Sequence, residues 1–109
     1  MVILHRLLKL QVEGREIDVP VRIHLPVDNG DSWHCEYEIA WPNKPRKTKI
    51  HGIDSVQSLL LALQTIAVEL YSSEAHKSGK LKWEKPGDGY GFPLHPATRD
   101  LHEGDDKLM

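Results

Sequence analysis

The clearest pattern in the chain is an amphipathic helix predicted over residues 54–71. Six apolar residues recur at helical spacing on one predicted face: Val56, Leu59, Leu60, Leu63, Ala67 and Leu70. At the start, Asp54 is suited to accept a backbone N–H, and Gln57 follows three residues later as in a capping box. No other segment has a comparable helical pattern. The preceding segments are therefore expected to supply the surface that this helix covers.

Alternating apolar and polar residues predict four strands before the helix, over residues 2–12, 15–25, 32–41 and 47–53. The sequence Glu13-Gly14 offers a two-residue turn between the first two strands. The fourth segment is short and basic, which is typical of an edge strand. Pro20 lacks a backbone donor, so the second strand should have an edge or a bulge near it.

Loop lengths predict how these strands pair. A turn at Glu13-Gly14 sets Leu10 opposite Ile17, Leu8 opposite Val19 and Lys9 opposite Asp18. A loop over residues 27–31 gives five further pairs: Leu25 with Trp33, Ile23 with Cys35, Val21 with Tyr37, Arg22 with Glu36, and His24 with His34. A slip by one residue would place apolar side chains opposite polar ones. The sequence thus predicts an α+β fold, a four-stranded antiparallel meander (ββββ) with one long helix on its apolar face.

The pattern weakens after Tyr71. Residues 72–79 are predicted as a fraying helix end, with Gly79 as its stop. Residues 81–84 alternate briefly and predict a short fifth strand. They begin an aromatic, glycine-rich segment, 81–93, that should dock onto the body through Tyr90 and Phe92. We therefore expect a single domain over residues 1–93, followed by a disordered acidic tail over 94–109.

Composition adds little to this description. The chain has 109 residues, and its net charge is −2. Residues 95–109 carry that whole excess, so no global field favours nucleic acid or a membrane. Cys35 is the only cysteine, which excludes an internal disulfide and favours a reducing compartment. No signal peptide or membrane span is apparent, so we expect a cytoplasmic protein.

The candidate chemistry is sparse. His24 and His34 are brought together by the predicted pairing, with Glu36 and His51 near them, but no metal-ligand spacing is present. A solvated polar face explains the same residues, and we expect no cofactor. Cys35 cannot form a dyad with His34 because neighbours in a strand point to opposite faces. The glycine-rich stretch 87–91 is followed by Phe92-Pro93 rather than by a helix, so it does not predict a phosphate site.

Two basic clusters suggest nucleic-acid binding as an alternative. One spans residues 44–49 and the other residues 77–85. They would merge if residues 81–84 paired beside the fourth strand, and Trp83 could then stack on a base. An edge-protecting role explains the first cluster equally well.

The chain also resembles a family of small bacterial domains without an assigned activity. The motifs that carry the resemblance are Trp33-His34-Cys35-Glu36-Tyr37, the segment from Gly52 to Leu63, Gly79 with Leu81 and Trp83, and Gly91-Phe92-Pro93. It spans residues 7–93. The resemblance implies a bacterial cytoplasmic domain and assigns no cofactor or catalytic residue.

Three functional hypotheses follow. The first is a non-enzymatic protein-binding module: an adaptor, an immunity-type protein or a subunit of a homo-oligomer. Its partner would be another chain or a second copy, and its candidate surface residues are Trp41, Trp83, Tyr90, Arg46, Lys47 and Lys49. The second is a nucleic-acid-binding domain that uses the two basic clusters. The third is a small metal-dependent enzyme that uses His24, His34 and Glu36.

Overall fold

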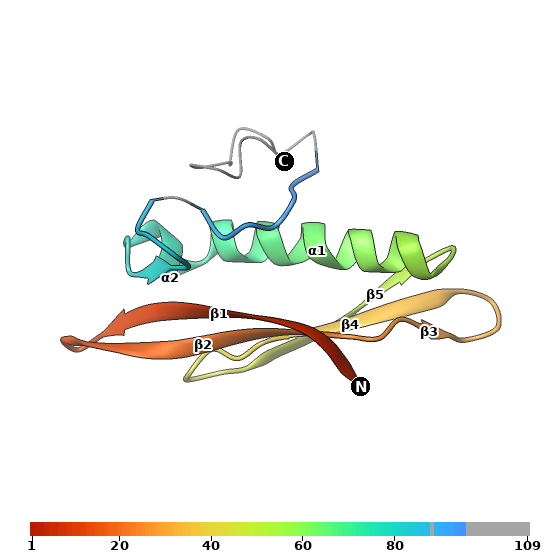
Figure 1. Cartoon of the computed structure of the whole chain (residues 1–109), viewed down its shortest axis with the longest axis horizontal. Coiled ribbons are helices and arrows are strands. Elements are labelled where there is room, and N and C mark those ends of the chain that lie inside the picture. The colour runs from red at the N-terminus through yellow and green to blue at the C-terminus, as the bar shows by residue number, and fades with distance from the viewer. Residues whose placement is uncertain (88, 96–109) are drawn as a thin grey trace.

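An antiparallel sheet with one long helix across it makes up the protein (Figure 1). This architecture comes from a computed structural model, which describes residues 1–87 and 89–95. The strands are β1 (Val2–Val12), β2 (Arg15–His24), β3 (Val27–Asp28), β4 (Trp33–Ile39), β5 (Arg46–Gly52) and β6 (Leu81–Lys82). The helices are α1 (Ser55–Ser72) and α2 (Glu74–Lys77).

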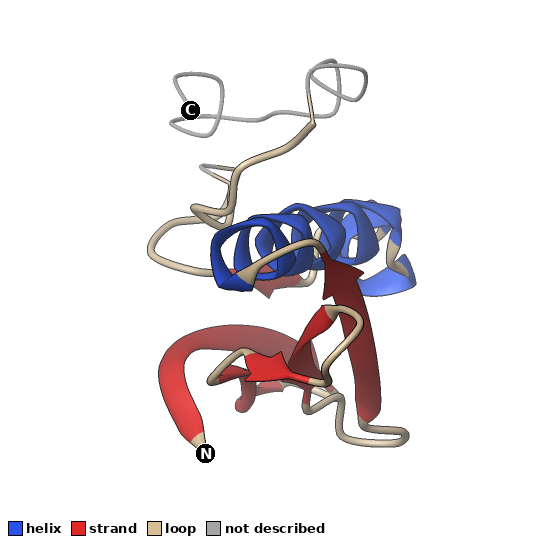
Figure 2. Ribbon diagram, turned by 90° about the vertical axis from the view of Figure 1, so that its right-hand side faces the viewer, coloured by secondary structure: helices blue, strands red, loops and turns tan. Residues whose placement is uncertain are grey.

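The predicted meander is confirmed: β1, β2, β4 and β5 lie side by side in that order, and every pairing is antiparallel. The short fifth strand predicted after the helix corresponds to β6, which pairs with β1. β3, which pairs with the start of β4, was not predicted. The sheet formed by the described residues therefore has six strands. Figure 2 shows α1 on one side of the sheet, whereas no helix formed by the described residues covers the other side.

The first hairpin has the predicted register, with Leu10 opposite Ile17 and Leu8 opposite Val19. The second register is shifted by two residues, so the predicted pairs of β2 with β4 are wrong. Arg22 faces Glu38 instead of Glu36, and Ile23 faces Tyr37 instead of Cys35. The cause is the turn over residues 29–32, closed by a 2.8 Å bond from the Asn29 N–H to the Ser32 carbonyl. This turn lies further along the chain than predicted, and a shift of two keeps every side chain on its face.

The start of α1 agrees with its predicted cap. Asp54 accepts the N–H of Gln57 at 2.8 Å. The Gln57 side chain reaches back to the N–H of Ile53 at 2.7 Å, one residue before the cap. Two backbone donors at the helix start are thereby satisfied.

The helix is rotated relative to the predicted face. Its buried residues are Ser58, Ala62, Ile66, Ala67, Leu70 and Tyr71. Val56 and Leu60 were predicted to face the sheet, but they are 72% and 45% exposed. Small residues allow this close approach: a Cβ on Gly52 would lie 2.6 Å from the Ser58 nitrogen. The backbones of β5 and α1 thus meet closely at Gly52 and Ser58. The other four residues of the predicted face agree with the structure: Ala67 and Leu70 are buried, and Leu59 and Leu63 pack against the core.

α1 ends abruptly at Ser72, where the sequence predicted that the helix would fray gradually. Ser73 has extended backbone angles, and its hydroxyl accepts the His76 N–H at 3.2 Å. It therefore begins the separate short helix α2, where a fraying end was expected. Gly79 follows with a φ of +72°, in keeping with its predicted role as a stop.

The segment after β6 closes the core. Tyr90, Phe92 and Leu94 are all buried, which confirms the predicted docking of the first two. The predicted domain boundary at residue 93 is one residue short, because Leu94 also packs in the core. The rest of the predicted tail, residues 96–109, lies outside the described residues.

Candidate functional site

A cavity of about 470 Å³ opens at the loop that joins β4 to β5. We call it the Trp41 pocket. Leu10 and Val12 of β1 line one part, and residues 41–46 line the rest. The lining is largely apolar, with Trp41 and two prolines, and Lys44 and Arg46 are its cationic residues. Its size is typical of a ligand site or of a pocket for an anchoring side chain.

Pro20 determines where this loop leaves the sheet. The Ala40 N–H donates to the Pro20 carbonyl at 3.0 Å, but Pro20 has no N–H to return. Pro42 also has no N–H to donate at the next pairing position, so the ladder between β2 and β4 ends here, and the Trp41 N–H bonds back to Ile39 at 2.9 Å. Residues 41–45 turn away from β2 instead of extending β4. The predicted edge or bulge near Pro20 is thus the end of a ladder.

Glu69 of α1 fixes the position of Arg46 at the pocket. One carboxylate oxygen, Oε1, accepts bonds from the Tyr37 hydroxyl at 2.6 Å and from Arg46 Nε at 2.9 Å. The other oxygen, Oε2, is buried and has no hydrogen-bond partner among the described residues. Burial, followed by the bond to Glu69, raises the pKa of Tyr37, and the same carboxylate raises the pKa of Arg46. Helix and sheet are tied together beside the pocket.

The charges at this pocket suit an acidic partner. Arg46 uses Nε for Glu69, so its terminal amino groups make no hydrogen bond to any described residue. Lys44 forms no ion pair within the described part of the chain. A partner group with an apolar side chain and a neighbouring carboxylate would match both the lining and these cations.

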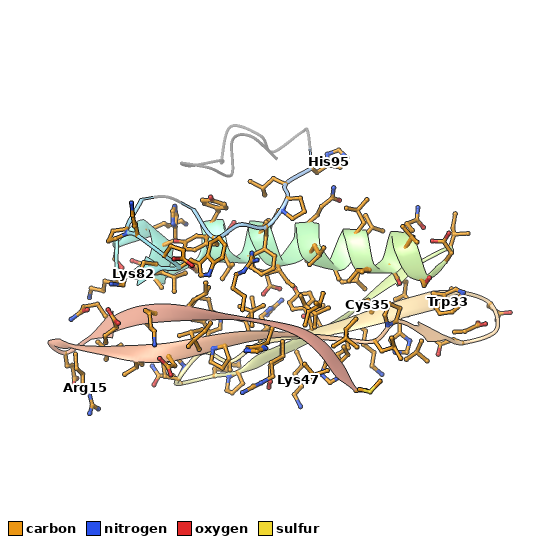
Figure 3. All side chains as sticks on the ribbon, in the orientation of Figure 1. Arg15, Trp33, Cys35, Lys47, Lys82 and His95 are labelled. Atoms are coloured by element: carbon orange, nitrogen blue, oxygen red, sulfur yellow. The ribbon has the colours of Figure 1, made fainter. Side chains whose placement is uncertain are left out.

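The opposite face of the sheet carries a ladder of paired charges. Arg22 donates to Glu38 at 2.7 Å, and Lys47 is opposite Glu38 on the next strand. Lys49 is opposite Glu36 in the same way. Figure 3 shows Lys47 on the side of the sheet away from α1. The two predicted surface lysines therefore lie on this outer face and do not line the Trp41 pocket.

The candidate metal ligands do not converge. His24 lies 3.8 Å from Glu36, but His34 faces His51 with ring centroids 6.0 Å apart. The predicted pairing of His24 with His34 fails because of the shifted register. No group of three or more histidine, cysteine, aspartate or glutamate side chains in residues 1–87 and 89–95 is placed to hold a metal ion.

Tyr90 lies in the interior, whereas Trp83 is half-buried, as Trp41 is. The Tyr90 hydroxyl lies 2.5 Å from His76 Nδ1. The Arg6 guanidinium stacks 4.0 Å from the centroid of the Trp83 ring. A Cβ on Gly91 would collide with that ring, so only glycine fits there. The burial of Tyr90 does not agree with a surface role, and the surface role of Trp83 stays a prediction.

The two basic clusters lie on opposite edges of the sheet. β5 carries Arg46, Lys47 and Lys49 at one edge, whereas β6 carries Lys82 at the other. β1, β2 and β4 separate the two edges. The expected merger would need β6 to pair with β5, but it pairs with β1. Lys82 also forms a 3.0 Å ion pair with Glu16, which leaves its charge less available to bind a nucleic-acid phosphate.

Cys35 is buried against the helix side of the sheet, as predicted. Its thiol lies 3.4 Å from the His24 carbonyl, and burial raises its pKa above the usual 9.0. A thiol with a raised pKa is a poor nucleophile. None of the helices in the described part of the chain combines the length and apolar character that a membrane span needs.

Arg6 is the residue that the sequence analysis missed. It occupies the helix side of β1, and its Nη1 donates to the carbonyls of Tyr90 at 3.0 Å and Gly91 at 2.8 Å. The signal was present as a single charge interrupting the apolar positions Leu4, Leu8 and Leu10. Glu69 gave no comparable signal, since an acidic residue on a helix normally faces solvent.

Sheet, helix and docked segment define a small α+β domain that uses residues from β1 through Leu94. The chain belongs to the family described as a domain of unknown function (DUF6968), whose model matches residues 4–94. No curated protein and no solved structure matches the chain. The matched range ends at Leu94, the last buried residue described.

Proposed function

We propose that the protein is a non-enzymatic protein-binding module that receives an apolar side chain of its partner in the Trp41 pocket. An acidic residue of the partner would lie beside Lys44. The observation that carries this proposal is the half-buried Trp41 in an apolar cavity with cationic residues beside it. Tryptophan and arginine are enriched among the residues that dominate binding energy at protein interfaces.

Other features of the chain agree with this role. A single buried thiol fits a reducing, cytoplasmic setting. An adaptor or immunity-type protein requires a rigid scaffold around its binding pocket. The hydrogen bond from Arg46 to Glu69 joins the sheet to the helix beside the pocket and contributes that rigidity. The nucleic-acid alternative is less well supported because its two clusters occupy opposite sheet edges. The metal-dependent alternative lacks a converging set of ligands among the described residues.

A peptide-display selection against the immobilised protein tests the proposal. We expect enriched peptides that combine a large apolar residue with a nearby aspartate or glutamate. Trp41→Ala should weaken the selected peptides by about tenfold or more, the effect of losing an anchoring aromatic. Lys44→Glu should weaken the acidic peptides, mostly by slowing association.

Two matched variants serve as controls for that selection. Trp33→Ala removes a half-buried tryptophan outside the pocket, and Lys80→Glu reverses an exposed charge outside it. Both should bind the selected peptides as the parent protein does, and thermal unfolding checks that all four variants are folded. If no peptide is enriched, or if the enriched peptides bind Trp41→Ala unchanged, the proposed function is wrong.

A further inference from the structure

Another cavity, of about 450 Å³, lies between α2 and the segment that follows β6. We call it the lysine cavity. Its two walls are joined where His76 Nδ1 of α2 lies 2.5 Å from the Tyr90 hydroxyl. Figure 3 shows Lys82, one of its lining residues, at the end of the molecule where α2 lies. The cavity shares no lining residue with the Trp41 pocket, and its volume is within the range of small-molecule sites.

The charge in this lining is positive. Its cationic residues are Lys77, Lys82 and Lys85, and none of its described residues is a carboxylate. Lys82 is paired with Glu16, whereas Lys77 and Lys85 are exposed and form no ion pair within the described residues. Asp88 lies outside the described residues. Two ammonium groups therefore share one cavity, and no described carboxylate balances them.

The backbone of the lining adds a donor without a partner. Gly89 is buried, yet its N–H donates to no group in the part of the chain that the structure describes. Buried backbone N–H groups are nearly always hydrogen-bonded, so an acceptor bound beside Gly89 would satisfy this one. Gly79 and Gly87 also line the cavity, and a Cβ on either would meet no atom within 4 Å. These glycines leave the backbone open to a ligand.

We propose that the lysine cavity binds a small phosphorylated molecule. Lys77 and Lys85 would hold its phosphate, and the apolar residues Leu81 and Pro86 would contact its organic part. A phosphate offers several acceptor oxygens, which match a lining that supplies ammonium groups and a backbone N–H. Lysine is a common phosphate ligand because it provides a compact point charge. The site uses no helix N-terminus, which is why the glycine-rich stretch 87–91 did not predict it.

Titration calorimetry with inorganic pyrophosphate and with phenyl phosphate tests this proposal. We expect saturable binding of both probes to one site, weakened as the salt concentration rises. Lys77→Gln combined with Lys85→Gln should weaken both by about tenfold or more, because charge-assisted hydrogen bonds are lost. In amide NMR spectra the signals of Gly87 and Gly89 should shift as pyrophosphate is added.

The matched control is Lys47→Gln combined with Lys49→Gln, which removes the same number of exposed charges outside the cavity. It should bind pyrophosphate as the parent protein does. Trp41→Ala should do so too, and this separates the lysine cavity from the proposed function. Three results would overturn the proposal: no saturable binding of either probe, equal losses in the two double variants, or tighter binding of a single-stranded oligonucleotide than of phenyl phosphate.

Discussion

Arg6 shows how one charged side chain can organise an apolar region. It lies on the helix side of β1, where its neighbours Leu4, Leu8 and Leu10 are apolar. Two carbonyls and two aromatic rings surround its guanidinium. These contacts hold the segment that follows β6 against the sheet, so a residue near one end of the domain positions residues near the other.

Removing Arg6 should therefore loosen that segment. We expect Arg6→Ala to lower the free energy of unfolding by about 2–3 kcal/mol, because hydrogen bonds from a charged group and cation–π contacts are lost together. Urea unfolding measures this value. Arg15→Ala, at an exposed position of β2, should change it by less than about 0.5 kcal/mol. Equal effects of the two exchanges would show that the contacts of Arg6 do not stabilise the fold.

The buried thiol of Cys35 makes stability depend on pH. Its pKa is raised in the folded protein, so the unfolded chain ionises first as the pH increases. This contribution to stability is complete below the ordinary thiol pKa of 9.0, which the unfolded chain has, and is lost as the pH rises toward the folded pKa. The loss should amount to at most about 1.4 kcal/mol per pH unit.

Urea unfolding at several alkaline pH values measures the expected decline. Cys35→Ala removes the titrating thiol, so its stability should fall less steeply than that of the parent protein over the same range. Lysines and tyrosines affect both proteins alike, and the difference between the two slopes isolates Cys35. Parallel slopes would contradict the assignment of this pH dependence to Cys35.

At the scale of the elements, the helix face gives the sharpest stability prediction. Ile66 is fully buried, whereas Leu60 is nearly half exposed, although both are large apolar residues of α1. Ile66→Ala should cost about 2–5 kcal/mol, and Leu60→Ala should fall within about 0.5 kcal/mol of the parent protein. Denaturant unfolding of both variants decides the question. A larger cost at Leu60 would mean that α1 packs through its leucine-rich side.

The elements themselves could be predicted because alternation and helical spacing are local properties of the sequence. The face of α1 could be predicted only in part: Ala67 and Leu70 are buried as expected, whereas Val56 and Leu60 are exposed, since the sequence has leucines on one side and small residues on the other. Close packing at Gly52 and Ser58 favours the small side, and that contact depends on where β5 ends. The register of β2 with β4 failed for a similar reason, because a turn at residues 29–32 replaced the expected loop.

The candidate site was only partly predictable. Trp41 and Arg46 were expected at a surface, and the structure brings them together at one pocket. Lys47 and Lys49 follow Arg46 in sequence but lie on the outer face, opposite Glu38 and Glu36. Tyr90 was expected both to dock and to be an anchor, and its burial leaves only the docking. Aromatic content alone does not distinguish an interior residue from an interface residue.

For the whole molecule, the two edges of the sheet have different chemistry. The β5 edge carries lysines, which discourage pairing with another strand. The β1 edge is apolar and lacks free charges before Lys9 among the described residues. The Trp41 pocket lies at neither edge but beside the end of the β2–β4 ladder.

The break that Pro20 makes in the ladder also has a consequence for how the pocket can change. The ladder ends at two prolines: Pro20 has no N–H to offer Ala40, and Pro42, which lines the cavity, has none to offer at the next pairing position. An ordinary amino acid at position 20 would restore the first donor, but Pro42 would still keep the loop out of the sheet. The cavity is therefore protected against a single exchange in β2, and closing it requires changes on both strands.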